Sequence, residues 1–249
     1  MITRGQRPEE RAAAGKLGRK MTMEKKSYSV AIDGPSGAGK STIARSVARD
    51  LGFHYVDTGA IYRTVGYYAY LAGCDPQDRA AVVDLLPKIR VEMGYGEDGL
   101  QRMRLNGEDV TEQIRLPEIS MYASRVSAVP EVRAFLMEMQ RDAARHGSVI
   151  MDGRDIGTVV LPGADVKIFL TASPEDRARR RYEELLRRGT PKEYQELLEE
   201  IRQRDYNDSH RAAAPLRPAE DAILLDTTGN TFDQSRRQIL EIIRGRIAQ

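Results

Sequence analysis

The sequence predicts an α/β fold in which a doubly wound, five-stranded parallel sheet carries helices on both faces. Short, almost continuously apolar runs, typical of buried parallel strands, recur at YSVAID (28–33), FHYVD (53–57), SVIMD (148–152), VKIFL (166–170) and AILLD (222–226). Longer stretches with helical periodicity separate most of these runs. The first run also leads through a glycine-rich turn directly into an amphipathic helical pattern. Together these observations favour a doubly wound sheet.

The composition is that of a globular protein with a sizeable core. The 249 residues are 41% hydrophobic and 31% charged. No apolar stretch approaches the roughly eighteen residues that a membrane span needs. The single cysteine, Cys74, excludes an internal disulfide, and the first residues lack the apolar centre of a secretory signal. We therefore expect a cytoplasmic protein with no membrane partner, and a monomer is the default expectation.

The formal charge of +2 is unevenly divided along the chain. Residues 1–27 hold eight Lys or Arg and three Glu, so the remaining residues carry a small negative excess. This basic leader is poor in apolar residues, and we expect it to be disordered. A start at Met21 or Met23 would make it dispensable. Because the body, 28–249, lacks a broad basic excess, we expect no nucleic-acid partner.

Two regions depart from simple alternation of strand and helix. In residues 89–110, apolar and polar residues alternate around the turns GEDG (96–99) and Asn106-Gly107, which predicts a small antiparallel meander. Further on, Ser173 and Pro174 begin a helix that Gly189 ends, and a second helix runs toward Arg211. Thr231 and Gln234 form a capping-box pair that begins the last helix.

The turn after the first strand matches the pattern G-x-x-x-x-G-K-S/T. It reads Gly34, Pro35, Ser36, Gly37, Ala38, Gly39, Lys40, Ser41 and then Thr42. Glycines let backbone amides curl inward around phosphate oxygens, and the positive end of the following helix points at the same place. Lys40 is expected to reach the β- and γ-phosphates, and Ser41 to bind Mg²⁺. The sequence therefore predicts a P-loop NTPase whose residues 34–42 bind a nucleoside triphosphate.

Arginines follow the strands at the edge where such sheets bind ligands. Arg63 and Arg154 each come shortly after a predicted strand, while Arg204 and Arg211 flank Asp208. Planar guanidinium groups suit phosphate oxygens. The cluster therefore indicates a second phosphate-bearing substrate that faces the loop.

A carboxylate at a strand end is expected to support Mg²⁺. We assign this role to Asp152, which ends the run SVIMD, together with the Ser41 hydroxyl. Asp33 and Asp57 end neighbouring strands and are alternatives to Asp152.

From Tyr28 to the C-terminus the chain resembles the bacterial cytidylate kinases, which belong to the P-loop nucleoside monophosphate kinase superfamily. The resemblance rests on IDGPSGAGKS, DTGAIYR, the meander, DGRDIGTVVLPGADVKIFL, APLRPAED and the pattern R-D-x-x-D-x-x-R at 204–211. It implies transfer of the γ-phosphoryl group of ATP to CMP or dCMP, in pyrimidine nucleotide metabolism. It also implies one kinase domain, 28–249, with a monophosphate-binding insert (87–130) and a helical lid (177–211).

The resemblance further implies roles for the residues at matching positions. The acceptor phosphate would be held by Thr58, Arg63, Arg154 and Arg211. The base would be read by Ser124, Arg133 and Asp155, and the ribose by Arg204 and Asp208. Arg177 and Arg181 would belong to the mobile lid over ATP. Catalysis is then assigned to Lys40, Arg154, Arg177, Arg181 and Arg211.

The expected role of Asp155 agrees with the chemistry of cytosine. A carboxylate accepts a hydrogen bond from the exocyclic amine of cytosine. Uracil would instead place a carbonyl against Asp155, and two facing acceptors cost on the order of 1–3 kcal/mol. The sequence therefore predicts a preference for CMP and dCMP over UMP.

Three other functions compete with this interpretation. A regulatory GTPase would need N-K-x-D, which is absent, and its D-x-x-G switch occurs here as Asp226–Gly229 beside the last strand, which is the wrong place. A nucleic-acid-binding ATPase would rest on the basic leader. An adenylate or shikimate kinase is the nearest alternative, and the meander and the 204–211 pattern oppose it.

Overall fold

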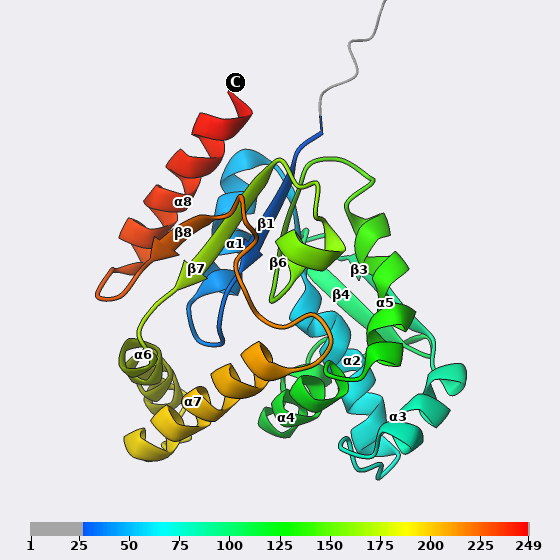
Figure 1. The fold of residues 1–249 in the computed structure, drawn as a ribbon. Helices are drawn as coiled ribbons and strands as arrows, with labels where there is room; N and C mark the ends of the chain where they lie inside the picture. The colour runs from blue at the N-terminus through cyan, green and yellow to red at the C-terminus, as the bar shows by residue number, and fades with distance from the viewer. Residues whose placement is uncertain (1–26, 249) are drawn as a thin grey trace, which may run out of the picture.

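A parallel sheet forms the centre of the computed structural model, which describes residues 27–248 (Figure 1). Its strands, in the spatial order β2-β6-β1-β7-β8, are β2 (His54–Asp57), β6 (Val149–Gly153), β1 (Ser29–Asp33), β7 (Val166–Thr171) and β8 (Ile223–Asp226). The predicted five-stranded parallel sheet is thus confirmed. The predicted disordered leader, residues 1–27, lies outside the described residues except for Ser27.

The two faces of the sheet bury separate apolar cores. Val30 and Ile32 of β1 pack with α1 (Lys40–Leu51) and α8 (Phe232–Ile247). Ala31, which points to the opposite face, packs with α2 (Thr58–Leu71) and α5 (Pro130–Ala143). Because successive strand residues alternate between faces, a strand that is apolar throughout needs helices on both sides. The doubly wound arrangement is therefore confirmed.

The predicted meander forms a second, antiparallel sheet beside the first. It consists of β3 (Val91–Tyr95), β4 (Gln101–Leu105) and β5 (Glu108–Asp109), in that order. It is flanked by α3 (Arg79–Leu85), the short 3₁₀ turns at Leu86–Lys88 and Gln113–Arg115, and α4 (Pro117–Val126). Gly66 lets α2 approach α4 closely, because a β-carbon at Gly66 would lie 2.8 Å from the Ala123 nitrogen.

Two helices beyond β7 pack against each other away from the central sheet (Figure 1). They are α6 (Pro174–Arg187) and α7 (Tyr194–His210), and they share a small core of Ala178, Leu198 and Ile201. The Ser173 side chain accepts a hydrogen bond from the Asp176 nitrogen (3.1 Å), so the predicted cap of α6 is confirmed. A single π-helical turn, Ile156–Val160, follows β6 and had no counterpart in the sequence prediction.

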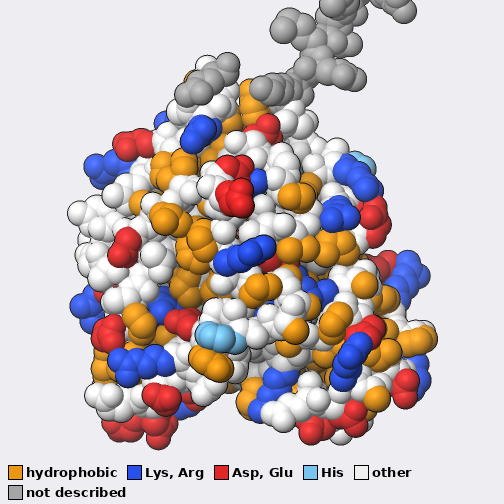
Figure 2. Space-filling model, in the orientation of Figure 1, with side chains coloured by type: hydrophobic (Ala, Val, Ile, Leu, Met, Phe, Trp, Pro, Cys, Tyr) orange, Lys and Arg blue, Asp and Glu red, His pale blue; other side chains and the backbone are white. Residues whose placement is uncertain are grey.

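Charged groups of both signs are scattered over the face seen in Figure 2, among uncharged and hydrophobic side chains. Within residues 27–248, no helix is both long and apolar enough to cross a membrane.

The capping box at the start of α8 yields a stability prediction. The Thr231 hydroxyl accepts from the Gln234 nitrogen (3.2 Å), and the Gln234 side chain accepts from the Thr231 nitrogen (2.8 Å). Thr231→Ala is expected to lower the free energy of unfolding by about 1 kcal/mol. Urea denaturation measures this change, and Thr231→Ser serves as the control that keeps the hydroxyl. An alanine variant as stable as the serine variant would contradict the capping role.

Candidate active site

The glycine-rich turn joins β1 to α1 and closes around a buried lysine. Gly34 adopts φ 149°, and a β-carbon there would lie 1.9 Å from the Leu170 carbonyl oxygen, so another residue does not fit. The Lys40 Nζ donates a hydrogen bond to the Pro35 carbonyl oxygen at 2.7 Å. Burial, reinforced by the nearby positive charge of Arg154, holds the Lys40 pKa well below its usual range. An anion at this turn would therefore relieve an unfavourable concentration of positive charge.

Three carboxylates end neighbouring strands at this edge, and the structure distinguishes them by their partners. Asp152 accepts from the Ser41 hydroxyl (2.8 Å) and from the Tyr55 hydroxyl (2.8 Å). Asp57 instead caps α2 through the Ala60 nitrogen (3.0 Å) and pairs with Arg115.

Asp33, the third carboxylate, accepts from two backbone amides. Within residues 27–248, Asp152 is therefore the one of these three carboxylates that is hydrogen-bonded to Ser41. Burial and the neighbouring Asp57 raise the pKa of Asp152 to about 6.

A pair of hydroxyl and carboxylate oxygens is the kind of donor set that suits Mg²⁺. Magnesium prefers oxygen ligands, keeps several waters and is often bound by one or two protein groups together with substrate phosphates. Among residues 27–248, no three His, Cys, Asp or Glu side chains are grouped so that they could hold a metal ion by themselves. Ser41 and Asp152 therefore fit a magnesium ion whose remaining ligands are phosphate and water.

The residues expected to hold the acceptor phosphate come from three segments. Thr58, the first residue of α2, donates to the Asp152 carbonyl oxygen (2.8 Å). Arg63, one turn further on, donates to the Ile114 carbonyl oxygen (3.3 Å). The Arg154 Nε donates to an Asp208 carboxylate oxygen (2.8 Å), so β6 and α7 are linked through an ion pair.

Arg204 lies near Arg63, Arg154 and Asp208 and has a side-chain nitrogen that makes no hydrogen bond within residues 27–248. This nitrogen, Nε, is buried. Burial and the charge of Arg154 lower the Arg204 pKa to about 10. Asp208 offsets part of this repulsion: burial raises the Asp208 pKa, but the charges of Arg154, Arg204 and Arg211, together with the hydrogen bond from Arg154, lower it, and the net shift is downward.

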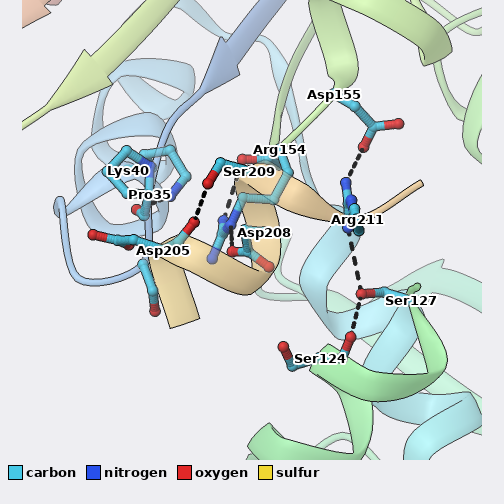
Figure 3. A network of polar contacts seen from close by, with 12 residues as sticks. Pro35, Lys40, Ser124, Ser127, Arg154, Asp155, Asp205, Asp208, Ser209 and Arg211 are labelled. Carbon is cyan, nitrogen blue, oxygen red and sulfur yellow. Dashed lines mark hydrogen bonds and ion pairs between the residues drawn. The ribbon is translucent and has the colours of Figure 1, made fainter. Parts of the chain in front are cut away.

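Figure 3 shows the Arg154–Asp208 pair between the loop that carries Lys40 and a second cluster around Arg211. In that cluster Asp155 forms a buried ion pair with Arg133, and the Arg211 Nη2 lies 3.6 Å from the other oxygen of Asp155. Ser124 is linked to this cluster only indirectly: its carbonyl oxygen accepts from the Ser127 hydroxyl (2.8 Å), which in turn accepts from Arg211 (3.5 Å). Of the residues expected to read the base, the structure thus brings Arg133 and Asp155 into direct contact.

The two arginines of α6 have different environments. Arg177 is buried and donates to the Ser36 carbonyl oxygen (3.0 Å) and to the Asp205 carboxylate, so it joins α6, α7 and the phosphate loop. Arg181 is half exposed and pairs with Glu184 of its own helix. The structure therefore places Arg177, but not Arg181, in contact with the loop.

Three contacts of the site went unnoticed in the sequence. Tyr55 binds Asp152, Asp205 binds Arg177, and the Ser127 carbonyl oxygen accepts from Arg133 (3.2 Å). A signal for Asp205 was available, because it stands beside Arg204 in the 204–211 pattern. Tyr55 and Ser127 lie in apolar or helical stretches that suggest packing, so no comparable signal marks them.

A phosphate loop between β1 and α1, facing half-buried arginines from α7 and from the end of β6, defines a P-loop phosphotransferase. Comparison with known proteins narrows this class. Residues 30–245 match the family model of cytidylate kinase. The chain therefore belongs to the cytidylate kinase family.

Individual relatives agree with the family model. A cytidylate kinase of Caldicellulosiruptor bescii is 50% identical over 217 residues, covering 87% of this chain and 96% of the relative. A cytidylate kinase of Exiguobacterium sp. is 49% identical, covering 88% and 99%. The crystal structure of a shikimate kinase from Bacteroides thetaiotaomicron covers 90% of this chain and 100% of its own, at 16% identity and a TM-score of 0.42, which is too low to bear on the reaction.

Proposed function

We propose that this protein transfers the γ-phosphoryl group of ATP to the phosphate of CMP or dCMP, giving ADP and CDP or dCDP. The observation that carries the proposal is the crowding of cations opposite the phosphate loop. Burial and then the charge of Arg154 lower the pKa of both Lys40 and Arg204, so these like charges repel one another in the protein. Two phosphate-bearing substrates that meet there would offset this repulsion.

The acceptor would bind by exchanging ion pairs that already exist. Arg154 now pairs with Asp208, and both are assigned to the acceptor. A monophosphate would take the Arg154 guanidinium, with Thr58, Arg63 and Arg211 as further donors. Asp208 would then accept from a ribose hydroxyl, and Arg204 would use its unpartnered Nε. Binding therefore replaces one ion pair by several charge-assisted hydrogen bonds.

The base would be selected by the Asp155 cluster. Arg133 keeps the Asp155 carboxylate in place within a buried ion pair, and Ser124 lies nearby on α4. A fixed carboxylate accepts from the cytosine amine and opposes the uracil carbonyl. This arrangement supports the predicted preference for CMP and dCMP over UMP.

On the donor side, the backbone amides of residues 34–42 would surround the ATP phosphates, and Lys40 would turn from the Pro35 carbonyl oxygen to the β- and γ-phosphates. Ser41 and Asp152 would hold Mg²⁺. When bound, this ion would supply positive charge that offsets the charge developing on the transferring phosphates. The attacking oxygen belongs to an anionic phosphate, so the chain needs to orient and desolvate it rather than deprotonate it.

The helices α6 and α7 are assigned to the lid, 177–211, and the meander to the monophosphate-binding insert, 87–130. Arg177 and Arg181 would approach the transferring group when the lid closes. The separate core of α6 and α7 supports movement of these helices as a unit. The monomeric state and the cytoplasmic location stay predictions.

A coupled ADP-release assay with ATP and Mg²⁺ tests the proposed function. We expect turnover of CMP and dCMP, weaker turnover of UMP, and none of AMP or shikimate. Equal efficiency with CMP and UMP would contradict the assignment of the base site, and turnover of shikimate or AMP in place of CMP would overturn the function.

The Ser41–Asp152 pair predicts a change in metal dependence. Ser41→Ala is expected to raise the Mg²⁺ concentration needed for half-maximal activity by about tenfold, because the ion would lose the Ser41 hydroxyl, one of the two side-chain oxygens proposed to bind it. A Mg²⁺ titration at fixed ATP measures this shift. Ser46→Ala is the matched control, since Ser46 lies on the same helix but bonds Arg236. Equal titrations for the two variants would contradict a magnesium role for Ser41.

A further inference from the structure

Asp33 connects the strand before the phosphate loop to the turn that carries Arg154 and Asp155. It is the last residue of β1 and is buried, with 5% of its surface exposed. Its Oδ1 accepts from the Ile156 nitrogen (2.8 Å) and its Oδ2 from the Gly157 nitrogen (2.7 Å). Both carboxylate oxygens are thus bonded to amides that follow β6, more than a hundred residues along the chain.

These two amides are the first of the π-helical turn Ile156–Val160, whose N-cap position is Asp155. An aspartate at an N-cap ordinarily accepts from amides of the first turn through its own side chain. The Asp155 side chain makes no such bond; it pairs with Arg133 instead. Asp33 therefore satisfies amides that the local capping residue leaves unpaired, and the Asp155 carboxylate stays available for another partner.

The approach of Asp33 to this turn is close. A β-carbon at Gly157 would lie 3.4 Å from the Asp33 Oδ2 and 3.2 Å from the Lys167 side chain. Burial raises the pKa of Asp33 to about 6, although the two amide hydrogen bonds lower it. Such a buried carboxylate persists in a fold when its hydrogen bonds offset its desolvation.

We infer that Asp33 is a positioning residue for the acceptor nucleotide. It holds the turn from Arg154 to Gly157 against the strand that leads into Gly34, so that the Asp155 carboxylate faces the base and Arg154 faces the phosphate. The Asp33 carboxylate thereby connects the phosphate loop that begins at Gly34 to the turn that carries Arg154 and Asp155. This inference rests on the proposed function, because it assumes that Arg154 and Asp155 bind the acceptor.

The variant Asp33→Asn tests the inference. The carboxamide keeps the size of the side chain but retains one acceptor oxygen, so its NH₂ group opposes one of the two amides. We expect the KM for CMP to rise by about tenfold, with a KM for ATP within about twofold of the original value. The ratio of kcat/KM for CMP to that for UMP is expected to fall, because Asp155 is held less firmly.

The control is Asp165→Asn. Asp165 precedes β7, and its carboxylate accepts from the Ser29 nitrogen (2.7 Å) at the opposite end of β1, so the same chemical change is made at a carboxylate that contacts the other end of this strand. This control is expected to keep both the KM for CMP and the base preference. If Asp33→Asn lowered only kcat or thermal stability, and left the KM for CMP and the CMP-to-UMP ratio unchanged, Asp33 would be a structural residue and the inference would be wrong.

Two further measurements keep the test decisive. If Asp33→Asn does not fold, Asp33→Ser removes the buried charge and leaves a single short hydroxyl that cannot serve both the Ile156 and the Gly157 amides, and a rise in the KM for CMP is again expected. An unchanged KM in that variant would then overturn the inference. The original protein is assayed first: failure to phosphorylate CMP refutes the proposed function, whereas normal activity with insensitive variants refutes the positioning role alone.

Discussion

Lys40→Met is expected to lower kcat/KM by about 10²–10³-fold, the loss typical when a fixed donor to transition-state charge is removed. Lys40 is buried beside the phosphate loop, where its ammonium would meet the β- and γ-phosphates. Methionine has a similar length without the charge. Steady-state kinetics with ATP and CMP measure the loss.

The same substitution should leave the fold as stable as before, or make it more stable. Burial and Arg154 hold the Lys40 pKa well below its usual range, which means that the folded state disfavours the charged lysine. Removing that charge relieves this penalty, so activity and thermal stability are expected to change in opposite directions. Misfolding would lower both.

Arg49→Met provides the matched control for Lys40→Met. Arg49 lies in the last turn of the same helix and is exposed. The charge change is identical, but the site is untouched, so kcat/KM is expected to stay within about twofold and stability to fall by at most about 1 kcal/mol. A similar loss of activity in both variants would show that net charge, rather than the position of Lys40, matters.

The parts of the fold that are determined by residues close together in the sequence could be predicted from the sequence. The strands, the meander and the caps at Ser173 and Thr231 are encoded by local patterns, and the structure confirms them. The helices α4 and α5 had a local signal as well, because Pro117 and Pro130 occupy first helical positions. The π-helical turn had none, since its amides are satisfied by Asp33 from another strand.

The choice among the three strand-end carboxylates shows where sequence reasoning stops. Asp33, Asp57 and Asp152 all end apolar runs, so pattern alone ranks them equally. Asp33 and Asp152 bond to groups about a hundred residues away in the sequence. Asp57 bonds to the Ala60 nitrogen at the start of α2 and to Arg115, which follows the meander. The register of β1 against β6 places Asp152 beside the end of β1, close to the turn that carries Ser41.

Asp155→Asn is expected to reduce the preference for CMP over UMP by about 10–100-fold in kcat/KM. The carboxamide presents one donor and one acceptor, so it no longer opposes the uracil carbonyl and accepts less strongly from the cytosine amine. Most of the change is expected as a loss with CMP. Competition between CMP and UMP in one reaction measures the ratio directly.

Two properties of the buried cluster make this result interpretable. Neutralising Asp155 leaves the Arg133 guanidinium with the Ser127 carbonyl oxygen as a remaining acceptor, so stability is expected to fall together with the preference. The KM for ATP, which depends on the loop across the site, should stay near its original value. A variant that lost stability but kept its CMP-to-UMP ratio would show that Asp155 supports the fold without reading the base, and a raised KM for ATP would place its effect on the donor side instead.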